Sequence, residues 1–206
     1  MALLLGIMSG ALSILGYIPY IIDTIRKRTQ PERASWLIWS TIGTISFLSQ
    51  VSEGATDSLW FAGVQVSGTI TIFVLSVRLG YGQYLSPKNR VVFSIAMCGV
   101  VAWYLTDSAV YALMISIAIG LLGGVVTIQK AYEDPDSETL STWVLALLAS
   151  VFAILAVGEL DWVLLAFPLY LLTLYTAIVA AILYRRHPKL RSGQPSVTDL
   201  RSVPCK

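Results

Sequence analysis

The sequence contains few of the residues that bind metals and cofactors. It has one histidine, His187, and two cysteines, Cys98 and Cys205, in 206 residues. Cysteines so few and so far apart predict neither a disulfide framework nor a metal cluster. A histidine near the C-terminal end leaves no imidazole for haem, zinc or a proton relay among the apolar segments. We therefore expect no cofactor, no metal and no enzymatic activity.

Charged residues are scarce as well. They make up 13% of the chain, against about 25% in typical soluble domains, and the mean hydropathy is +0.73. This composition predicts an all-α integral membrane protein with no nucleic-acid partner. A spanning helix needs roughly 20 apolar residues. We expect seven spans, near residues 2–22, 35–52, 58–79, 91–106, 108–129, 140–157 and 162–184.

The basic residues predict the orientation of these spans. All 14 Lys and Arg fall after the first, third, fifth and seventh segments. The charged residues of the other connections are all acidic. Because cytoplasmic loops carry the excess of Lys and Arg, we place the N-terminus outside and the C-terminus in the cytoplasm. The cluster Arg26, Lys27 and Arg28 is first of all a topology determinant that also contacts phosphate headgroups.

The chain also matches itself at an offset of 104 residues. Gly16 falls on Gly120, and the pairs that follow are Arg26 and Lys130, Pro31 and Pro135, Ser35 and Thr139, and Trp39 and Trp143. The match predicts two parallel three-helix bundles, 1–80 and 108–186, joined by a linker helix at 88–107 and followed by a disordered cytoplasmic tail, 187–206. Parallel repeats of this kind place a substrate site between the copies, near mid-membrane.

A three-helix unit with Pro19 late in its first helix, a basic turn, and a proline and tryptophan entry to the second helix resembles the PQ-loop superfamily. The 3+1+3 plan is similar to that of the SWEET sugar transporters. The family's Pro-Gln pair reads Pro19-Tyr20 here. The resemblance implies a transporter that works by alternating access, with a sugar-facing residue at Gln65 and an aromatic position near Phe47 to Gln50.

Polar side chains within apolar segments are the candidates for a solute pocket, because they usually face a cavity or a partner helix. The candidates are Gln50, Gln65, Thr69, Ser150, Tyr170 and Thr173, together with Phe47. A threonine can instead bond to its own helix backbone. Tyr17, Tyr20, Trp39 and Trp143 are candidates for an inner gate. Trp36, Trp60 and Trp162, near predicted helix ends, are typical of an interfacial belt.

Four further residues concern movement and coupling. Pro19 interrupts the helical hydrogen bonds and is either a hinge or a static kink. Gly123 and Gly124 lie at the matching place and either loosen that helix or allow tight packing. Asp23 is structural if it pairs with Arg26 or Lys27, and otherwise a candidate for a coupling proton.

These observations predict a transporter of a small neutral polar solute, sugar-like, acting by facilitated diffusion. A carrier of vitamins, nucleosides or amino acids with the same fold is an alternative, and so is a receptor that does not transport. We expect membrane lipids as partners and a bacterial inner membrane as the location, and homo-oligomerisation is left open.

Overall fold

The computed structural model describes residues 2–52, 57–83, 109–157 and 162–187, together with residues 90, 94, 97, 101, 104 and 105. The six long helices are α1 (Ala2–Ile25), α2 (Arg33–Ser52), α3 (Asp57–Leu79), α5 (Ala109–Glu133), α6 (Leu140–Val157) and α7 (Trp162–Arg186). A short 3-10 helix, η1 (Pro135–Ser137), precedes α6. The expected linker helix and the tail beyond His187 lie outside the described residues, apart from the six isolated positions.

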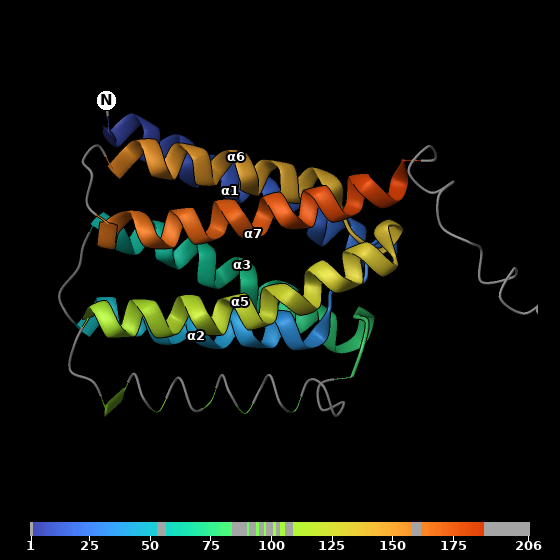
Figure 1. Cartoon of the computed structure of the whole chain (residues 1–206), viewed down its shortest axis with the longest axis horizontal. Coiled ribbons are helices and arrows are strands. Elements are labelled where there is room, and N and C mark those ends of the chain that lie inside the picture. The colour runs from blue at the N-terminus through green and yellow to red at the C-terminus, as the bar shows by residue number, and fades with distance from the viewer. Residues whose placement is uncertain are drawn as a thin grey trace, which may run out of the picture.

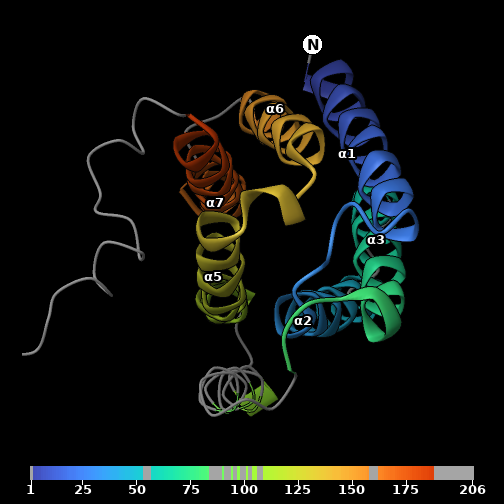
Figure 2. The same ribbon diagram turned by 90° about the vertical axis from the view of Figure 1, so that its right-hand side faces the viewer.

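The six long helices form a closed ring (Figures 1 and 2). Each packs against two others, in the order α1, α3, α2, α5, α7, α6 and back to α1. We call α1, α2 and α3 the first half, and α5, α6 and α7 the second half. The two halves meet at two seams, where α2 packs on α5 and α6 packs on α1.

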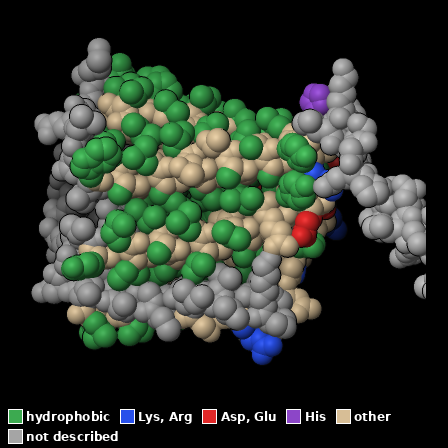
Figure 3. All heavy atoms as spheres, in the orientation of Figure 1, with side chains coloured by type: hydrophobic (Ala, Val, Ile, Leu, Met, Phe, Trp, Pro, Cys, Tyr) green, Lys and Arg blue, Asp and Glu red, His purple; other side chains and the backbone are tan. Residues whose placement is uncertain are grey.

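Most of the long helices coincide with long runs of apolar residues. Four are long and apolar enough to cross a membrane: Leu3–Ile25, Met114–Glu133, Leu140–Val157 and Leu165–Arg186. The described part of α3, Gly63–Leu79, is apolar but shorter. Hydrophobic side chains cover the face seen in Figure 3, and the coloured charged side chains lie towards its right-hand end. The part of the chain that the structure describes is therefore helical, and four of its helices are long and apolar enough for a membrane protein.

The α1–α2 turn shows how the chain reverses. Lys27 adopts a left-handed conformation (φ 58), which commonly ends a helix, and Pro31 follows shortly after. At the start of α2, the Glu32 carboxylate accepts a bond of 2.7 Å from the Ser35 backbone N–H, one of the donors that a helix N-terminus leaves unpaired. The turn is therefore built by local capping as well as by its basic residues.

Three other basic residues lie at slightly different places from those predicted. Arg78, Arg185 and Arg186 belong to the last turns of α3 and α7, not to the loops after them. The Arg185 Nε donates to the Tyr132 carbonyl at 3.0 Å, and an Arg186 amino group donates to the Pro135 carbonyl at 2.9 Å. These arginines tie the end of α7 to the end of α5 and to η1.

Candidate functional site

Five aromatic side chains from four helices meet inside the ring near its basic end, and we call them the aromatic layer. They are Tyr20 of α1, Trp36 and Trp39 of α2, Trp143 of α6 and Tyr175 of α7. The centroid of Trp36 lies 5.2 Å from those of Tyr20 and Trp39, and Trp143 lies 5.9 to 6.4 Å from its four neighbours. Both halves of the ring contribute, so the layer closes the space between them.

Each of the three indole N–H groups in the layer has an acceptor. The acceptors of Trp36, Trp39 and Trp143 are, in that order, the Tyr20 hydroxyl at 3.3 Å, the Gly120 carbonyl at 3.2 Å and the Glu138 carboxylate at 2.9 Å. A hydrogen-bonded indole is held in one orientation, since rotating it would leave a buried donor unpaired. The aromatic layer is therefore fixed by polar contacts as well as by packing.

Tyr20, Trp39 and Trp143 were predicted to lie at one gate, and the structure brings their rings together. The interfacial interpretation of Trp36 is wrong, because only 3% of its surface is exposed and it packs inside the ring. Trp162, at 74% exposure, lies on the surface as a belt residue would. The side chain of Trp60 is outside the described set.

A buried ion pair lies next to the aromatic layer. Lys130 Nζ is 2.6 Å from Glu138 Oε1, and the two side chains are 3% and 0% exposed. The same ammonium donates to the backbone carbonyls of Gln30 and Ser137. Lys130 therefore links the α1–α2 turn of the first half to the α5–α6 turn of the second half.

This pair was not predicted from the sequence, because Lys130 was placed in the connection after the fifth segment. Glu32 was missed for the same reason and is 3% exposed. Burial raises the pKa of its carboxyl, and hydrogen bonds from Ser35 and the charge of Lys130 oppose that rise. The only local signal was its position three residues before Ser35, at the start of an apolar run.

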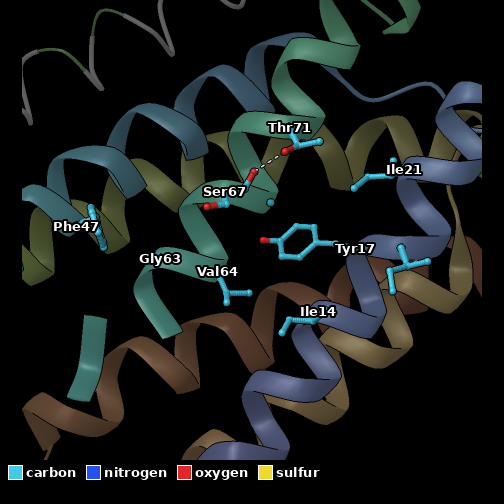
Figure 4. Close-up of a pocket in the computed structure, with 10 residues that line it drawn as sticks. Ile14, Tyr17, Ile21, Phe47, Gly63, Val64, Ser67 and Thr71 are labelled. Atoms are coloured by element: carbon cyan, nitrogen blue, oxygen red, sulfur yellow. Dashed lines mark hydrogen bonds between the residues drawn. The ribbon is translucent and has the colours of Figure 1, made fainter. Parts of the chain in front are cut away.

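Gln65 of α3 accepts a hydrogen bond of 2.8 Å from the Tyr17 hydroxyl of α1. The Tyr17 ring packs against the backbone of Gly68, where an added Cβ would lie 2.5 Å from a ring carbon. Tyr17 was expected in the gate, but the structure directs it to α3 (Figure 4). The pair uses the carbonyl of the Gln65 amide and leaves its NH₂ group to other acceptors.

A groove of about 720 Å³ runs along the α1–α3 interface, within the first half, beside Tyr17 (Figure 4). Its walls are mostly apolar, and Phe47 of α2 lines one end. Ile14 and Ile18 on its rim are 39% and 47% exposed, so the groove opens to the outer surface of the ring. The lining residues are Ile14, Tyr17, Ile18, Ile21, Phe47, Gly63, Val64, Ser67, Gly68 and Thr71.

The predicted hydroxyl residues mostly bond to their own helices. The Thr69 hydroxyl lies 3.0 Å from both the Gln65 and the Val66 carbonyl and donates its proton to one of them, and Ser150 donates to the Leu147 carbonyl at 2.7 Å. Thr173 donates to the Leu169 carbonyl at 2.8 Å.

Thr173 lies on an exposed face of α7 with Leu169, Thr176 and Leu183, away from Tyr175. It therefore faces out of the ring, and its assignment to the pocket is corrected. Tyr170 is buried, with its hydroxyl against Gly120 of α5. The side chain of Gln50 is not among those described.

The predicted hinge residues lie within continuous helices. α1 extends past Pro19 to Ile25. Gly123 and Gly124 are buried, and a Cβ on them would lie 3.2 Å from Trp39 Nε1 and 2.5 Å from Leu174 Cδ1 respectively. These two glycines allow α5 to approach α2 and α7 closely.

Asp23 accepts a bond of 3.1 Å from the Thr139 hydroxyl of the α5–α6 turn. The sequence offered Arg26 or Lys27 as its partner or, failing those, a role in proton coupling. The observed partner belongs to the other half of the ring, so Asp23 contributes to the contact between the two turns.

No protein-family model matches the chain, and no curated protein or solved structure is significantly similar to it.

Proposed function

We propose that the chain is a seven-span membrane protein made of two parallel three-helix repeats. The packing of the helices supports this, because it has the same pattern in both halves: if α1, α2 and α3 are matched with α5, α6 and α7, every packed pair has a matching packed pair. Each third helix packs between the other two of its own half. Each second helix packs on the first helix of the opposite half.

Hydrogen bonds at matched positions support the repeat as well. The carbonyls of Gly16 and Gly120 each accept a side-chain bond from the second helix of the opposite half, from Thr142 at 2.9 Å and from Trp39 at 3.2 Å. The carbonyls of Pro31 and Pro135 each accept a bond from the chain at or just beyond the end of the third helix.

The ends of the helices support a further crossing between the halves. α3 ends at the right-hand end of Figure 1 and α5 begins at the left-hand end, as one more crossing between them would require. With the basic end in the cytoplasm, the N-terminus would lie outside. The bacterial inner membrane stays our proposed location.

We propose that this ring is a transporter of a small neutral polar solute, working by alternating access as in the SWEET-like proteins it resembles. The observation that carries the proposal is that the ring of helices holds an aromatic layer and, next to it, a polar pair of side chains. The aromatic layer closes the basic end, and the Tyr17–Gln65 pair supplies hydroxyl and amide groups beside it. Rocking of the halves at their two seams would open either end in turn.

The aromatic layer favours a solute that carries a flat ring, such as a nucleoside or a related vitamin, over a simple sugar. Tyr and Trp rings stack on flat groups and offer a polar atom at one edge. A receptor with the same fold would need charges that face its ligand. The buried Lys130 and Glu138 bind each other, so they give that alternative little support.

A ligand screen tests the proposal. Purified protein is heated with panels of sugars, nucleosides and amino acids, and the compounds that raise its melting temperature are then tested for uptake into proteoliposomes. We expect Gln65→Ala to abolish the shift and the uptake, because the amide would bind the solute. Thr173→Ala, on the outer face, is the matched control and should preserve both. Uptake of no compound by the wild type, or an unchanged response of Gln65→Ala, would contradict the proposed function or its site.

A further inference from the structure

The carboxylate of Glu32 is held in one place. The backbone of its segment pairs with that of Tyr81, since Tyr81 N–H donates to the Pro31 carbonyl at 2.8 Å and Arg33 N–H donates to the Tyr81 carbonyl at 3.1 Å. Glu32 Oε1 lies 2.9 Å from where a Cβ on Gly82 would be, and Gly82 has a φ of +79. Only glycine combines that conformation with so close an approach.

The other carboxylate oxygen, Oε2, accepts a bond of 2.7 Å from the Ser35 backbone N–H and also faces the Ser35 hydroxyl, which has a second acceptor in α5. Ser35 Oγ is 3.0 Å from Glu32 Oε2 and 2.7 Å from the carbonyl oxygen of Gly123 in α5. A serine hydroxyl carries one proton and can donate only one hydrogen bond. It therefore cannot donate to an ionised Glu32 and to Gly123 at the same time.

A protonated Glu32 removes this conflict. The acid proton on Oε2 is donated to Ser35 Oγ, and the Ser35 hydroxyl proton is donated to the Gly123 carbonyl. When Glu32 releases its proton to water, the Ser35 hydroxyl turns towards the negative charge, because hydrogen bonds to ionised groups are the stronger ones. The bond to Gly123, which joins α2 of the first half to α5 of the second, is then lost.

We propose that Glu32 is a proton-binding site whose occupancy controls the Ser35–Gly123 bond and thereby the closure of the α2–α5 seam. Protonation closes the seam and deprotonation releases it. Ser35 transmits the state of Glu32 and is a positioning residue.

The titratable and charged groups around Glu32 come from every segment packed against it. They are Tyr20 of α1, Arg33 of α2, Tyr81 beyond α3, and Lys130 of α5 with its partner Glu138. Arg33 directs its guanidinium to the carbonyls of Ser76 and Gly82. Burial raises the pKa of the Glu32 carboxyl, and hydrogen bonds from Ser35 and from the Ala34 backbone, together with the charge of Lys130, oppose that rise.

This inference concerns the contact between the halves and holds whether or not the chain transports a solute. If the proposed function also stands, opening of the cytoplasmic end becomes dependent on pH. The group responsible is then Glu32, and Asp23, the sequence candidate for proton coupling, is not required.

Distances between spin labels test the proposal without any solute. Labels are attached to cysteines introduced at Val77 of α3 and Val125 of α5, which are 52% and 55% exposed. Cys98 and Cys205 are replaced by serine. The protein is placed in lipid nanodiscs, and the distance distribution is recorded from about pH 4 to about pH 9, a range that covers ordinary and raised carboxyl pKa values.

We expect one short-distance population at acidic pH and the loss of most of it, in favour of longer distances, as the pH rises. Glu32→Gln removes the negative charge that competes for the Ser35 hydroxyl, while its amide oxygen can still accept from the Ser35 backbone N–H, so it should hold the short distance at every pH. Ser35→Ala cannot make the bond and should show the long distances at every pH, and it keeps the test decisive if Glu32→Gln does not fold. Glu133→Gln, a surface carboxylate of α5, should behave as the wild type does.

A wild-type distribution that ignores pH would overturn the proposal, as would a Glu32→Gln or Ser35→Ala protein that keeps the wild-type transition. Since no solute is present, a failed uptake screen leaves this result untouched. A failed distance experiment likewise leaves the proposed transport activity untouched.

Discussion

The α1–α3 and α5–α7 interfaces are both closed by a glycine against a tyrosine, with the two roles reversed. In the first half the glycine is on the third helix, where Gly68 meets Tyr17 of α1. In the second half the glycine is on the first helix, where Gly120 meets Tyr170 of α7. The same close approach of helices is therefore reached from opposite sides.

The reversal changes the chemistry inside the ring. The Tyr17 hydroxyl reaches Gln65 of α3, whereas the position that matches Gln65 in α7 is Leu169, which is on an exposed face. A shared backbone arrangement thus places a tyrosine–glutamine pair at the α1–α3 interface and a leucine at the matching position of α7. If the ring binds a polar solute, the first half supplies the hydrogen bonds and both halves supply the aromatic rings.

The α1–α2 and α5–α6 turns differ even more between the halves. A substitution that removes this difference should give the largest loss of stability. Lys130 is buried and paired, whereas its counterpart Arg26 is exposed. Lys130→Met leaves the Glu138 charge buried without its partner and should lower the free energy of unfolding by about 3–5 kcal/mol. The check is reversible unfolding of the purified protein in detergent.

Arg26→Met is the matched control and should change the free energy of unfolding by less than about 0.5 kcal/mol, as exposed substitutions usually do. The double variant Lys130→Met with Glu138→Gln should recover part of the lost stability, because it removes the uncompensated charge. Equal losses from Lys130→Met and Arg26→Met would show that the two turns do not differ in this way.

The glycine contacts should give the next largest effect. A methyl group at Gly68 would lie 2.5 Å from the Tyr17 ring, so Gly68→Ala should displace the ring, separate it from Gln65 and lower stability by about 1–3 kcal/mol. At Gly124 the nearest atom is the flexible end of Leu174, also at 2.5 Å, and Gly124→Ala should lower stability by less. Thermal unfolding of both variants measures the difference.

Gly6 provides the control for these substitutions, because no atom lies within 4 Å of a Cβ added there. Gly6→Ala should leave stability unchanged or raise it by up to about 1 kcal/mol, since alanine favours the helix. A larger loss at Gly124 than at Gly68 would reverse the comparison and place the tighter interface in the second half.

The helices and the single basic end could be predicted from the sequence because they depend on local composition. Runs of apolar residues set the helices, and the placement of Lys and Arg set the basic end. Trp39 and Trp143 could be paired because the offset of 104 residues aligns them. These features need no knowledge of which helix lies beside which.

Glu32, Lys130 and Glu138 could not be found in this way. Each lies in or beside a turn that reads as an exposed connection, and each is buried because the two turns pack together. Thr173 was misplaced for a related reason. A residue of an apolar helix faces either the ring or its outside, and the neighbours of α7 decide which.

The smallest effects should come from the matched carbonyls of Gly16 and Gly120, which sharpen the comparison because both halves make the same contact. Thr142→Val and Trp39→Phe each remove one side-chain donor, and each should lower the free energy of unfolding by about 0.5–1.5 kcal/mol. Trp39→Phe should lie at the upper end, because it also removes ring contacts with Trp36 and Trp143. The two contacts lie on different seams, so the losses should add in the double variant, measured by the same unfolding experiment. A double variant that loses much more than the sum would contradict this independence and show that the stability of one seam depends on the other.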